Sequence, residues 1–118
     1  MKLLIVDDSE LLLDRVVSLL SDIENLEIVG TVQNSLLGEE LVEELNPDLV
    51  ISDIHMPGGG GFNLLEHVKS NHPEVIICIY TNYPHEQYRD KAMDLGADYF
   101  FHKNTETNKL YDTIAYHC

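Results

Sequence analysis

The stretch Leu3-Leu4-Ile5-Val6-Asp7-Asp8 decides the fold, because an apolar run stops abruptly at two carboxylates. The same arrangement returns at Leu49-Val50-Ile51-Ser52-Asp53. A buried strand that yields acidic side chains at its end has usually reached the carboxyl edge of a parallel sheet, where open α/β folds bind their ligands. Thr81 and Lys103 end two later apolar runs. The sequence therefore predicts one polar site at one edge of a parallel sheet.

Short β-branched segments alternate with longer segments of helical period along the chain. The expected strands are 2–6, 27–32, 48–52, 75–80 and 97–101, and the expected helices are 9–20, 35–45, 62–70, 84–95 and 105–116. This alternation indicates a parallel sheet covered by helices on both faces. We expect an α/β fold, a flavodoxin-like (βα)5 doubly wound sandwich with five parallel strands in the order 2-1-3-4-5.

Length and charge narrow the class of protein. The 118 residues have the size of one domain, so we expect a single domain over 1–118 with no effector domain in the chain. The formal charge of −14, from 21 acidic and 7 basic residues, argues against direct binding of nucleic acid, which depends on clustered Lys and Arg.

No apolar run approaches the ~20 residues that span a bilayer. Neither Cys78 nor Cys118 suggests a disulfide framework. These features predict a cytoplasmic protein without membrane insertion.

The predicted site suits phosphoryl chemistry. If strands one and three are neighbours, Asp7, Asp8 and Asp53 converge, and carboxylate oxygens of this kind suit Mg²⁺. An aspartate can also accept a phosphoryl group as a nucleophile. Lys103 and Thr81 would then supply an ammonium and a hydroxyl to its oxygens. The plainer alternative for the acidic pair alone is that Asp8 caps the next helix and Asp7 is solvated.

Several ordered motifs make the chain similar to a known family. They are Ile5-Val6-Asp7-Asp8-Ser9, Asp53-Ile54-His55-Met56-Pro57 with Gly61, Thr81, Gly96-Ala97-Asp98 and Lys103. Over essentially its whole length the chain resembles the receiver domain of two-component response regulators, in the single-domain form of the chemotaxis receivers.

The resemblance implies a role for each site residue. Asp53 would be phosphorylated by a sensor histidine kinase or a histidine phosphotransfer protein. Mg²⁺ would be held by Asp8, Asp53 and the backbone carbonyl of His55, with Asp7 assisting through water. Thr81 and Lys103 would contact the phosphoryl group.

Three further side chains would regulate the switch. Phe100, three residues before the lysine, would be the aromatic residue that turns inward on strand five. His55 and Tyr83, each two residues beyond a site residue, would tune the lifetime of the phosphoryl group.

The expected function is a phosphorylation-dependent signalling switch. Phosphorylation would alter the face formed by helix four and strand five, and so control a downstream protein target or a homodimer. Apart from its own phosphorylation and dephosphorylation, the chain would not be an enzyme. One alternative is a degenerate receiver that serves as a phosphorylation-independent docking module. A metal-dependent phosphatase is a weaker alternative, because His55 replaces the second acid, and a flavin binder conflicts with the acidic residues.

The chain also departs from the receiver pattern. Asn104 follows Lys103 where most receivers have proline, so a cis bond is not expected there. Asn82 replaces a small residue after Thr81 and would narrow the entrance to the site. We interpret Gly58 to Gly61 as a flexible lead into helix three, since no Gly-Lys-Ser/Thr follows.

Overall fold

Five parallel strands form one sheet in the order β2-β1-β3-β4-β5. The structure is a computed structural model, and it describes residues 1–56, 60–83 and 85–118. The strands are β1 (Lys2–Val6), β2 (Glu27–Val32), β3 (Leu49–Ser52), β4 (Ile76–Thr81) and β5 (Tyr99–His102). The predicted fold class and strand order are confirmed. Pro57, Gly58, Gly59 and Pro84 lie outside the described residues.

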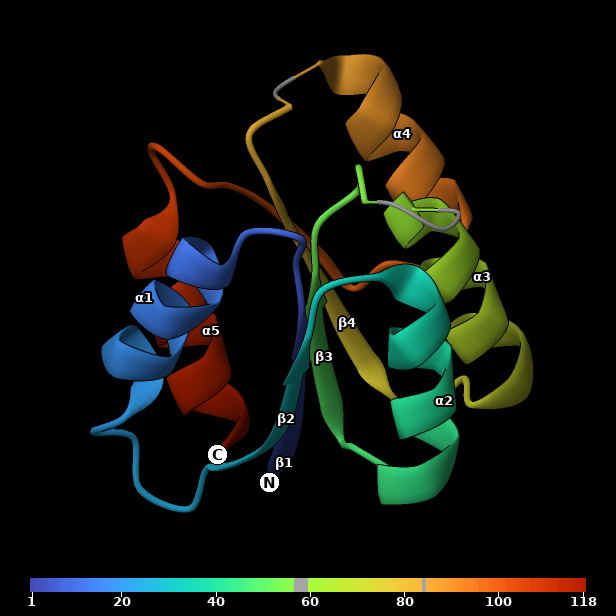
Figure 1. The fold of residues 1–118 in the computed structure, drawn as a ribbon. Coiled ribbons are helices and arrows are strands. Elements are labelled where there is room, and N and C mark those ends of the chain that lie inside the picture. Colours follow the sequence, from blue (N-terminus) through green and yellow to red (C-terminus); the bar gives the residue numbers. More distant parts are fainter. Residues whose placement is uncertain (57–59, 84) are drawn as a thin grey trace.

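Helices cover both faces of the sheet (Figure 1). They are α1 (Glu10–Leu20), α2 (Ser35–Leu45), α3 (Gly60–Asn71), α4 (Glu86–Asp94) and α5 (Thr107–His117). The core between the sheet and α1 with α5 contains Val16, Leu20 and Leu110. The core on the other face, beneath α2, α3 and α4, contains Val42, Leu64 and Ala92. Alternate residues of β1 and β3 pack into the two cores, because successive side chains in a strand point to opposite faces.

Side-chain caps begin two of the helices. Ser9 Oγ accepts a hydrogen bond from Leu12 N over 3.2 Å, and Asn34 Oδ1 accepts one from Leu37 N over 2.8 Å. Each bond satisfies an amide that the first turn of a helix leaves without an intrahelical partner. Ser9 is therefore the cap of α1, which leaves the neighbouring Asp8 available to the site.

Several predicted boundaries move by one or two residues. β4 runs one residue further than expected because Thr81 pairs with His102 of β5. β5 begins later than expected, at Tyr99, and the carboxylate of Asp98 just before it accepts hydrogen bonds from Ile77 N and Lys69 Nζ. α3 begins at Gly60 rather than residue 62, and the reason lies in the site.

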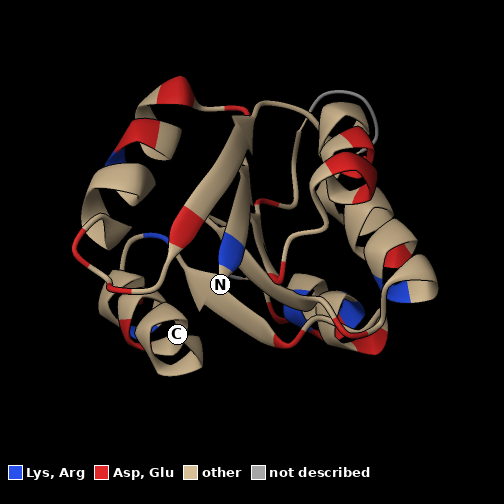
Figure 2. Cartoon of the chain, turned by 90° about the horizontal axis from the view of Figure 1, so that it is seen from below, with Lys and Arg blue, Asp and Glu red and all other residues tan. Residues whose placement is uncertain are grey.

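Acidic residues are distributed over the helices of both layers, and the few basic residues are dispersed among them (Figure 2). His67 and His72 share the carboxylate of Glu43. Their Nε2 atoms each lie 3.0 Å from Glu43 Oε1, so they link α2 to α3 and to the residue that follows α3. Among the described residues, the helices are all too short or too polar to cross a membrane.

Cys78 is a fully buried core side chain, as predicted. Burial raises the pKa of its thiol to about 12. Cys78 and Cys118 are both free thiols. A neutral, buried thiol is a poor nucleophile, so Cys78 contributes packing rather than chemistry.

Candidate functional site

Asp7, Asp8 and Asp53 meet at the carboxyl edge of the sheet. Strands β1 and β3 are neighbours, with Val6 opposite Ser52, so the residues that follow both strands lie side by side. Each of the three aspartates places one carboxylate oxygen within 4.8 Å of the other two. Asp7 and Asp53 are buried and Asp8 is exposed. The three acids predicted to converge therefore do so, with one of them open to solvent.

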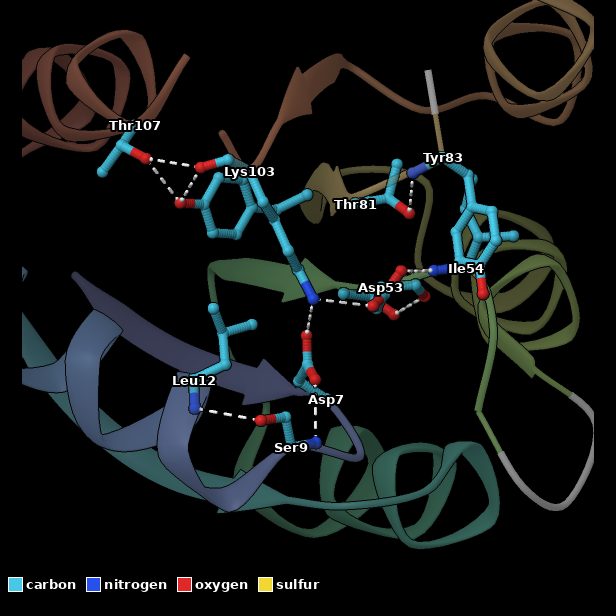
Figure 3. A network of polar contacts seen from close by, with 11 residues as sticks. Asp7, Ser9, Leu12, Asp53, Ile54, Thr81, Tyr83, Lys103 and Thr107 are labelled. Atoms are coloured by element: carbon cyan, nitrogen blue, oxygen red, sulfur yellow. Dashed lines mark hydrogen bonds and ion pairs between the residues drawn. The ribbon is translucent and has the colours of Figure 1, made fainter. Parts of the chain in front are cut away.

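Lys103, which follows the edge strand β5, contacts two of these acids. Its Nζ lies 2.7 Å from Asp7 Oδ2 and 2.7 Å from Asp53 Oδ2 (Figure 3). The lysine follows β5, two strands away from β3 in the sheet. The ammonium of Lys103 thus lowers the repulsion between the two buried carboxylates.

The electrostatics of the site reflect this balance. Burial raises the pKa of Asp7 above its ordinary value, and the hydrogen bonds from Lys103 Nζ and Ser9 N only partly oppose that effect. Burial alone would lower the pKa of Lys103, but hydrogen bonds to Asp53 and Asp7 outweigh it, so the pKa is raised. The lysine is therefore charged at neutral pH, as an electrostatic partner of phosphate must be.

The Asp53 carboxylate has a fixed orientation. Oδ1 accepts a hydrogen bond from Ile54 N over 2.6 Å while Oδ2 faces Lys103. The main-chain carbonyl of Asp53 accepts a bond from Ser52 Oγ over 2.8 Å. A carboxylate held at both oxygens has lost most of its rotational freedom before any reaction begins, which is the condition for efficient group transfer.

Gly61 makes the backbone geometry behind Asp53 possible. Its N–H donates to Ile54 O over 2.6 Å, and a Cβ built on it would lie 1.8 Å from the Asp53 carbonyl oxygen. Only glycine permits so close an approach of a helix to that carbonyl. The interpretation of this glycine as part of a flexible lead was wrong: Gly60 and Gly61 form the first turn of α3.

Thr81 and Tyr83 border the other side of Asp53 (Figure 3). Thr81 ends β4, is fully buried, and its Oγ1 accepts a hydrogen bond from Tyr83 N over 3.3 Å. The hydroxyl is thus present at the predicted edge of the sheet. Its bond to Tyr83 N ties the loop after β4 to the site.

His55 and Tyr83, the two residues predicted to tune the phosphoryl lifetime, contact each other. Their ring centroids are 4.0 Å apart, and Tyr88 of α4 packs edge-on against both rings, at 5.3 Å from His55 and 5.9 Å from Tyr83. No pattern in the sequence points to Tyr88, because its contacts with these rings depend on how α4 packs. The role of the His55 carbonyl stays a prediction.

Phe100 is buried on β5 and faces the core beneath α4. The guanidinium of Arg89 lies 5.8 Å from the centre of its ring, and Arg89 Nη1 donates to Phe100 O over 3.5 Å. A hollow of about 480 Å³ beside it is lined by Phe100, Arg89, His102 and Glu106, among others. Phe100 is therefore buried in this structure, and its role as the switch aromatic stays a prediction.

The loop after Lys103 has a trans backbone. The described part of the chain contains no cis peptide bond, in agreement with the expectation for Lys103-Asn104. Asn82 is exposed and lines a hollow of about 300 Å³ with Lys103 and Arg15. Asn82 thus lies at the margin of the site, where we expected it.

The arrangement of donors suits a hard divalent cation next to a phosphoryl group. Three carboxylates supply oxygen ligands, the donor type that Mg²⁺ prefers, and the exposed Asp8 leaves room for the waters that Mg²⁺ keeps. Lys103 and Thr81 add one positive charge and one hydroxyl. This combination can bind the cation and stabilise charge on phosphoryl oxygens.

A family model of the response regulator receiver domain matches residues 3–115. The chain belongs to this receiver-domain family. The suspected resemblance is confirmed, and with it a place in two-component signal transduction. Receiver domains generally bind Mg²⁺ in an acidic pocket, which agrees with the cluster of Asp7, Asp8 and Asp53.

Curated relatives of this receiver domain include two bacterial regulators. The transcriptional regulatory protein YdfI of Bacillus subtilis is 29% identical over 113 residues, which cover 96% of the chain and 53% of the relative. The nitrate/nitrite response regulator protein NarL of Escherichia coli is 32% identical over 108 residues, covering 92% and 50%. The chain thus spans about half the length of these relatives.

Solved structures agree with the fold of this receiver domain. A DNA-binding response regulator of the LuxR family from Staphylococcus aureus is 31% identical, with a TM-score of 0.89 and coverage of 96% of this chain and 94% of that one. The isolated receiver domain of RcsB from Salmonella enterica, solved with phosphomimetic BeF3⁻, has a TM-score of 0.91 at 24% identity, with coverage of 98% and 86%. The latter likeness concerns the fold.

Proposed function

We propose that this receiver domain is a phosphorylation-dependent switch in which Asp53 accepts a phosphoryl group. The donor is a sensor histidine kinase or a histidine phosphotransfer protein. The observation that carries the proposal is the pair of contacts from Lys103 Nζ to Asp7 and Asp53, both 2.7 Å long, inside a cluster of three acids. The intact set of site residues makes a phosphorylation-independent docking module the weaker candidate.

The transfer exchanges one bond to phosphorus for another. A carboxylate oxygen of Asp53 attacks the phosphorus of phosphohistidine, a P–O bond forms, the P–N bond breaks, and the leaving imidazole nitrogen keeps the electron pair. Ile54 N and Lys103 Nζ hold the carboxylate for that attack. Lys103 and the Thr81 hydroxyl then donate hydrogen bonds to the phosphoryl oxygens, since both lie at the same edge of the sheet. Loss of the group is hydrolysis of the acyl phosphate by water.

Mg²⁺ would be held by Asp8 and Asp53 directly and by Asp7 through water, with the backbone carbonyl of His55 as a further ligand. When bound, the cation neutralises charge on the phosphoryl oxygens as the new bond forms. The protein supplies the ligands: a buried pair of acids with Lys103 between them and an exposed Asp8 at the solvent side. Mg²⁺ binding would also supply positive charge that frees Lys103 to contact the phosphoryl group.

The output of the switch is a change on the face formed by α4 and β5. A movement of Thr81 toward a phosphoryl group would free packing space on the inner side of Phe100, whose ring lies 5.8 Å from the Arg89 guanidinium in this structure. The altered face would then bind a protein target or a second copy of the chain. The Staphylococcus relative is a DNA-binding protein, but the charge of −14 favours a protein partner for this chain, in the cytoplasm.

The direct test is phosphorylation with a small phosphodonor such as acetyl phosphate. We expect the wild-type chain with Mg²⁺ to gain one phosphoryl group by intact mass, and to show NMR shifts in α4 and β5 with beryllofluoride. Asp53→Asn is the matched control and should show neither response. A chain that takes up no phosphoryl group under these conditions would support the docking module instead.

A further inference from the structure

The carbonyl of Lys103 is held by hydroxyl groups to which the proposed function assigns no role. Thr107 Oγ1 donates to Lys103 O over 2.9 Å, and Tyr80 OH lies 2.8 Å from Thr107 Oγ1. Tyr80 OH is also 3.5 Å from Lys103 O. The close-up view shows the bond between Thr107 and Lys103 (Figure 3). Two hydroxyls therefore converge on the main chain of the residue whose ammonium reaches both acids.

Two adjacent residues of β4, Tyr80 and Thr81, restrain the backbone of Lys103. The Lys103 N–H donates to the carbonyl of Thr81 over 2.9 Å, and the side chain of Tyr80, one residue earlier, reaches the Lys103 carbonyl through Thr107. Tyr80 is 4% exposed, so its ring is fixed in the core beneath α1 and α5. The end of β4 thus determines where the backbone of Lys103 lies.

This restraint matters because the rest of the loop is open. Asn104 and Thr105 are exposed, and no proline limits the backbone after Lys103. Glu106, the residue before α5, does not cap the helix with its side chain, which accepts a bond from His102 N instead. The hydroxyl of Thr107, in the first turn of α5, is the contact that joins this helix to the Lys103 carbonyl.

We propose that Thr107 and Tyr80 are positioning residues that fix the Lys103 backbone, and thereby place its ammonium between Asp7 and Asp53. The inference rests on the proposed function and deepens it by naming residues that set the geometry of phosphoryl acceptance. Lysine has a long flexible side chain, so a loose backbone would spread its ammonium over many positions and lower the fraction correctly placed for transfer.

The experiment removes one hydroxyl at a time. Thr107→Val and Tyr80→Phe should each lower the rate of Asp53 phosphorylation at saturating acetyl phosphate by about fivefold, the effect of one hydrogen bond. The KM for acetyl phosphate and the affinity for Mg²⁺ should change little. The double variant should be no slower than the slower single variant, because both hydroxyls belong to one network. Thr107→Ser should restore the rate, and Thr105→Val, on the exposed part of the loop, should leave it unchanged.

A second measurement is independent of phosphorylation. In the metal-free protein, the ¹⁵N resonance of Lys103 Nζ should be resolved in the wild type and in Thr107→Ser, and broadened in Thr107→Val and Tyr80→Phe. If the wild type takes up no phosphoryl group but these resonances differ as stated, the proposed function fails while the positioning role stands. A Thr107→Val variant with wild-type rate and wild-type resonance would overturn the inference, whatever its thermal stability.

Discussion

The ammonium of Lys103 donates a hydrogen bond of 2.7 Å to the carboxylate of Asp53, 50 residues away in the sequence. Both side chains are only 8% exposed. The same ammonium also serves Asp7, so a single cation offsets two buried anions. The site in its metal-free form is therefore a charge cluster that Lys103 compensates only in part.

Lys103→Met should destabilise the metal-free protein by about 3 kcal/mol, because it leaves two buried carboxylates without their cation. The measurement is urea unfolding at neutral pH, with and without Mg²⁺. Mg²⁺ should recover part of the loss, since the cation replaces the missing charge. Lys109→Met is the matched control: Lys109 is exposed and pairs with Glu106, so its loss should cost less than about 0.5 kcal/mol. Equal effects of the two substitutions would contradict this account of the site.

Asp7→Asn should stabilise the metal-free protein at neutral pH. Burial raises the pKa of Asp7, so the folded chain holds the proton more tightly than the unfolded chain does. The favourable contribution of Asp7 is then fully present below the unfolded pKa, near 3.8, and is lost as the pH rises through the higher folded value. The amide avoids that loss, with an expected gain of about 1 kcal/mol at pH 7.

The pH dependence separates this effect from a general stabilisation. The difference between Asp7→Asn and wild type should shrink as the pH falls toward 3.8, the unfolded pKa. The affinity of Asp7→Asn for Mg²⁺ should be lower than that of the wild type, because the variant lacks the carboxylate that supports the cation through water. The checks are thermal unfolding across pH and Mg²⁺ titration. A stability gain that is constant with pH would contradict the role of the buried charge.

Much of the site follows from local sequence. Asp7 and Asp53 end apolar runs, and the strand order that makes β1 and β3 neighbours is a rule of the fold, so their meeting could be predicted. The contacts of Tyr88 with His55 and Tyr83 could not, because they depend on how α4 packs, which no local pattern encodes. The same holds for Glu43, which His67 and His72 share across two helices.

The start of α3 shows a conflict between propensity and packing. Glycine is unfavourable inside a helix, so helix propensity predicts that the loop includes Gly61 and that the helix begins at residue 62. The close approach of this residue to the Asp53 carbonyl excludes any side chain, and the helix begins at Gly60 despite the propensity. The low helix propensity of these two glycines costs conformational free energy. The fold tolerates this cost because the first turn of α3 can then pack against the main chain of Asp53.

Gly61→Ala should therefore be severely destabilising, by about 3 kcal/mol, because its Cβ would overlap the Asp53 carbonyl oxygen and a backbone shift is required. Urea unfolding measures the loss. Gly38→Ala is the matched control in α2: its Cβ would meet the side chains of Leu64 and Val6 at 3.2 and 3.3 Å, which can move by a few tenths of an ångström. We expect a change of at most about 1 kcal/mol there. If alanine were tolerated equally at both positions, the close approach at Asp53 would not be the reason for Gly61.

Tyr83→Ala should shorten the lifetime of phosphorylated Asp53. The ring of Tyr83 packs against His55 at 4.0 Å, and its N–H binds the Thr81 hydroxyl, so the side chain lies beside the phosphoryl position and limits the approach of water. The rate of phosphate loss should rise about threefold, which corresponds to ~0.7 kcal/mol in the barrier. The decay of the phosphorylated mass after removal of the donor measures this rate.

Two variants distinguish shielding by the ring from a general loosening of the protein. Tyr83→Phe keeps the ring and should decay at the wild-type rate. Tyr116→Ala removes an equally large ring from α5, where the side chain is 82% exposed, and should also leave the rate unchanged. If Tyr83→Ala lost phosphate no faster than these two controls, water access to Asp53 would have to be limited by other groups, and His55, whose ring lies 4.0 Å from that of Tyr83, would be the next side chain to test.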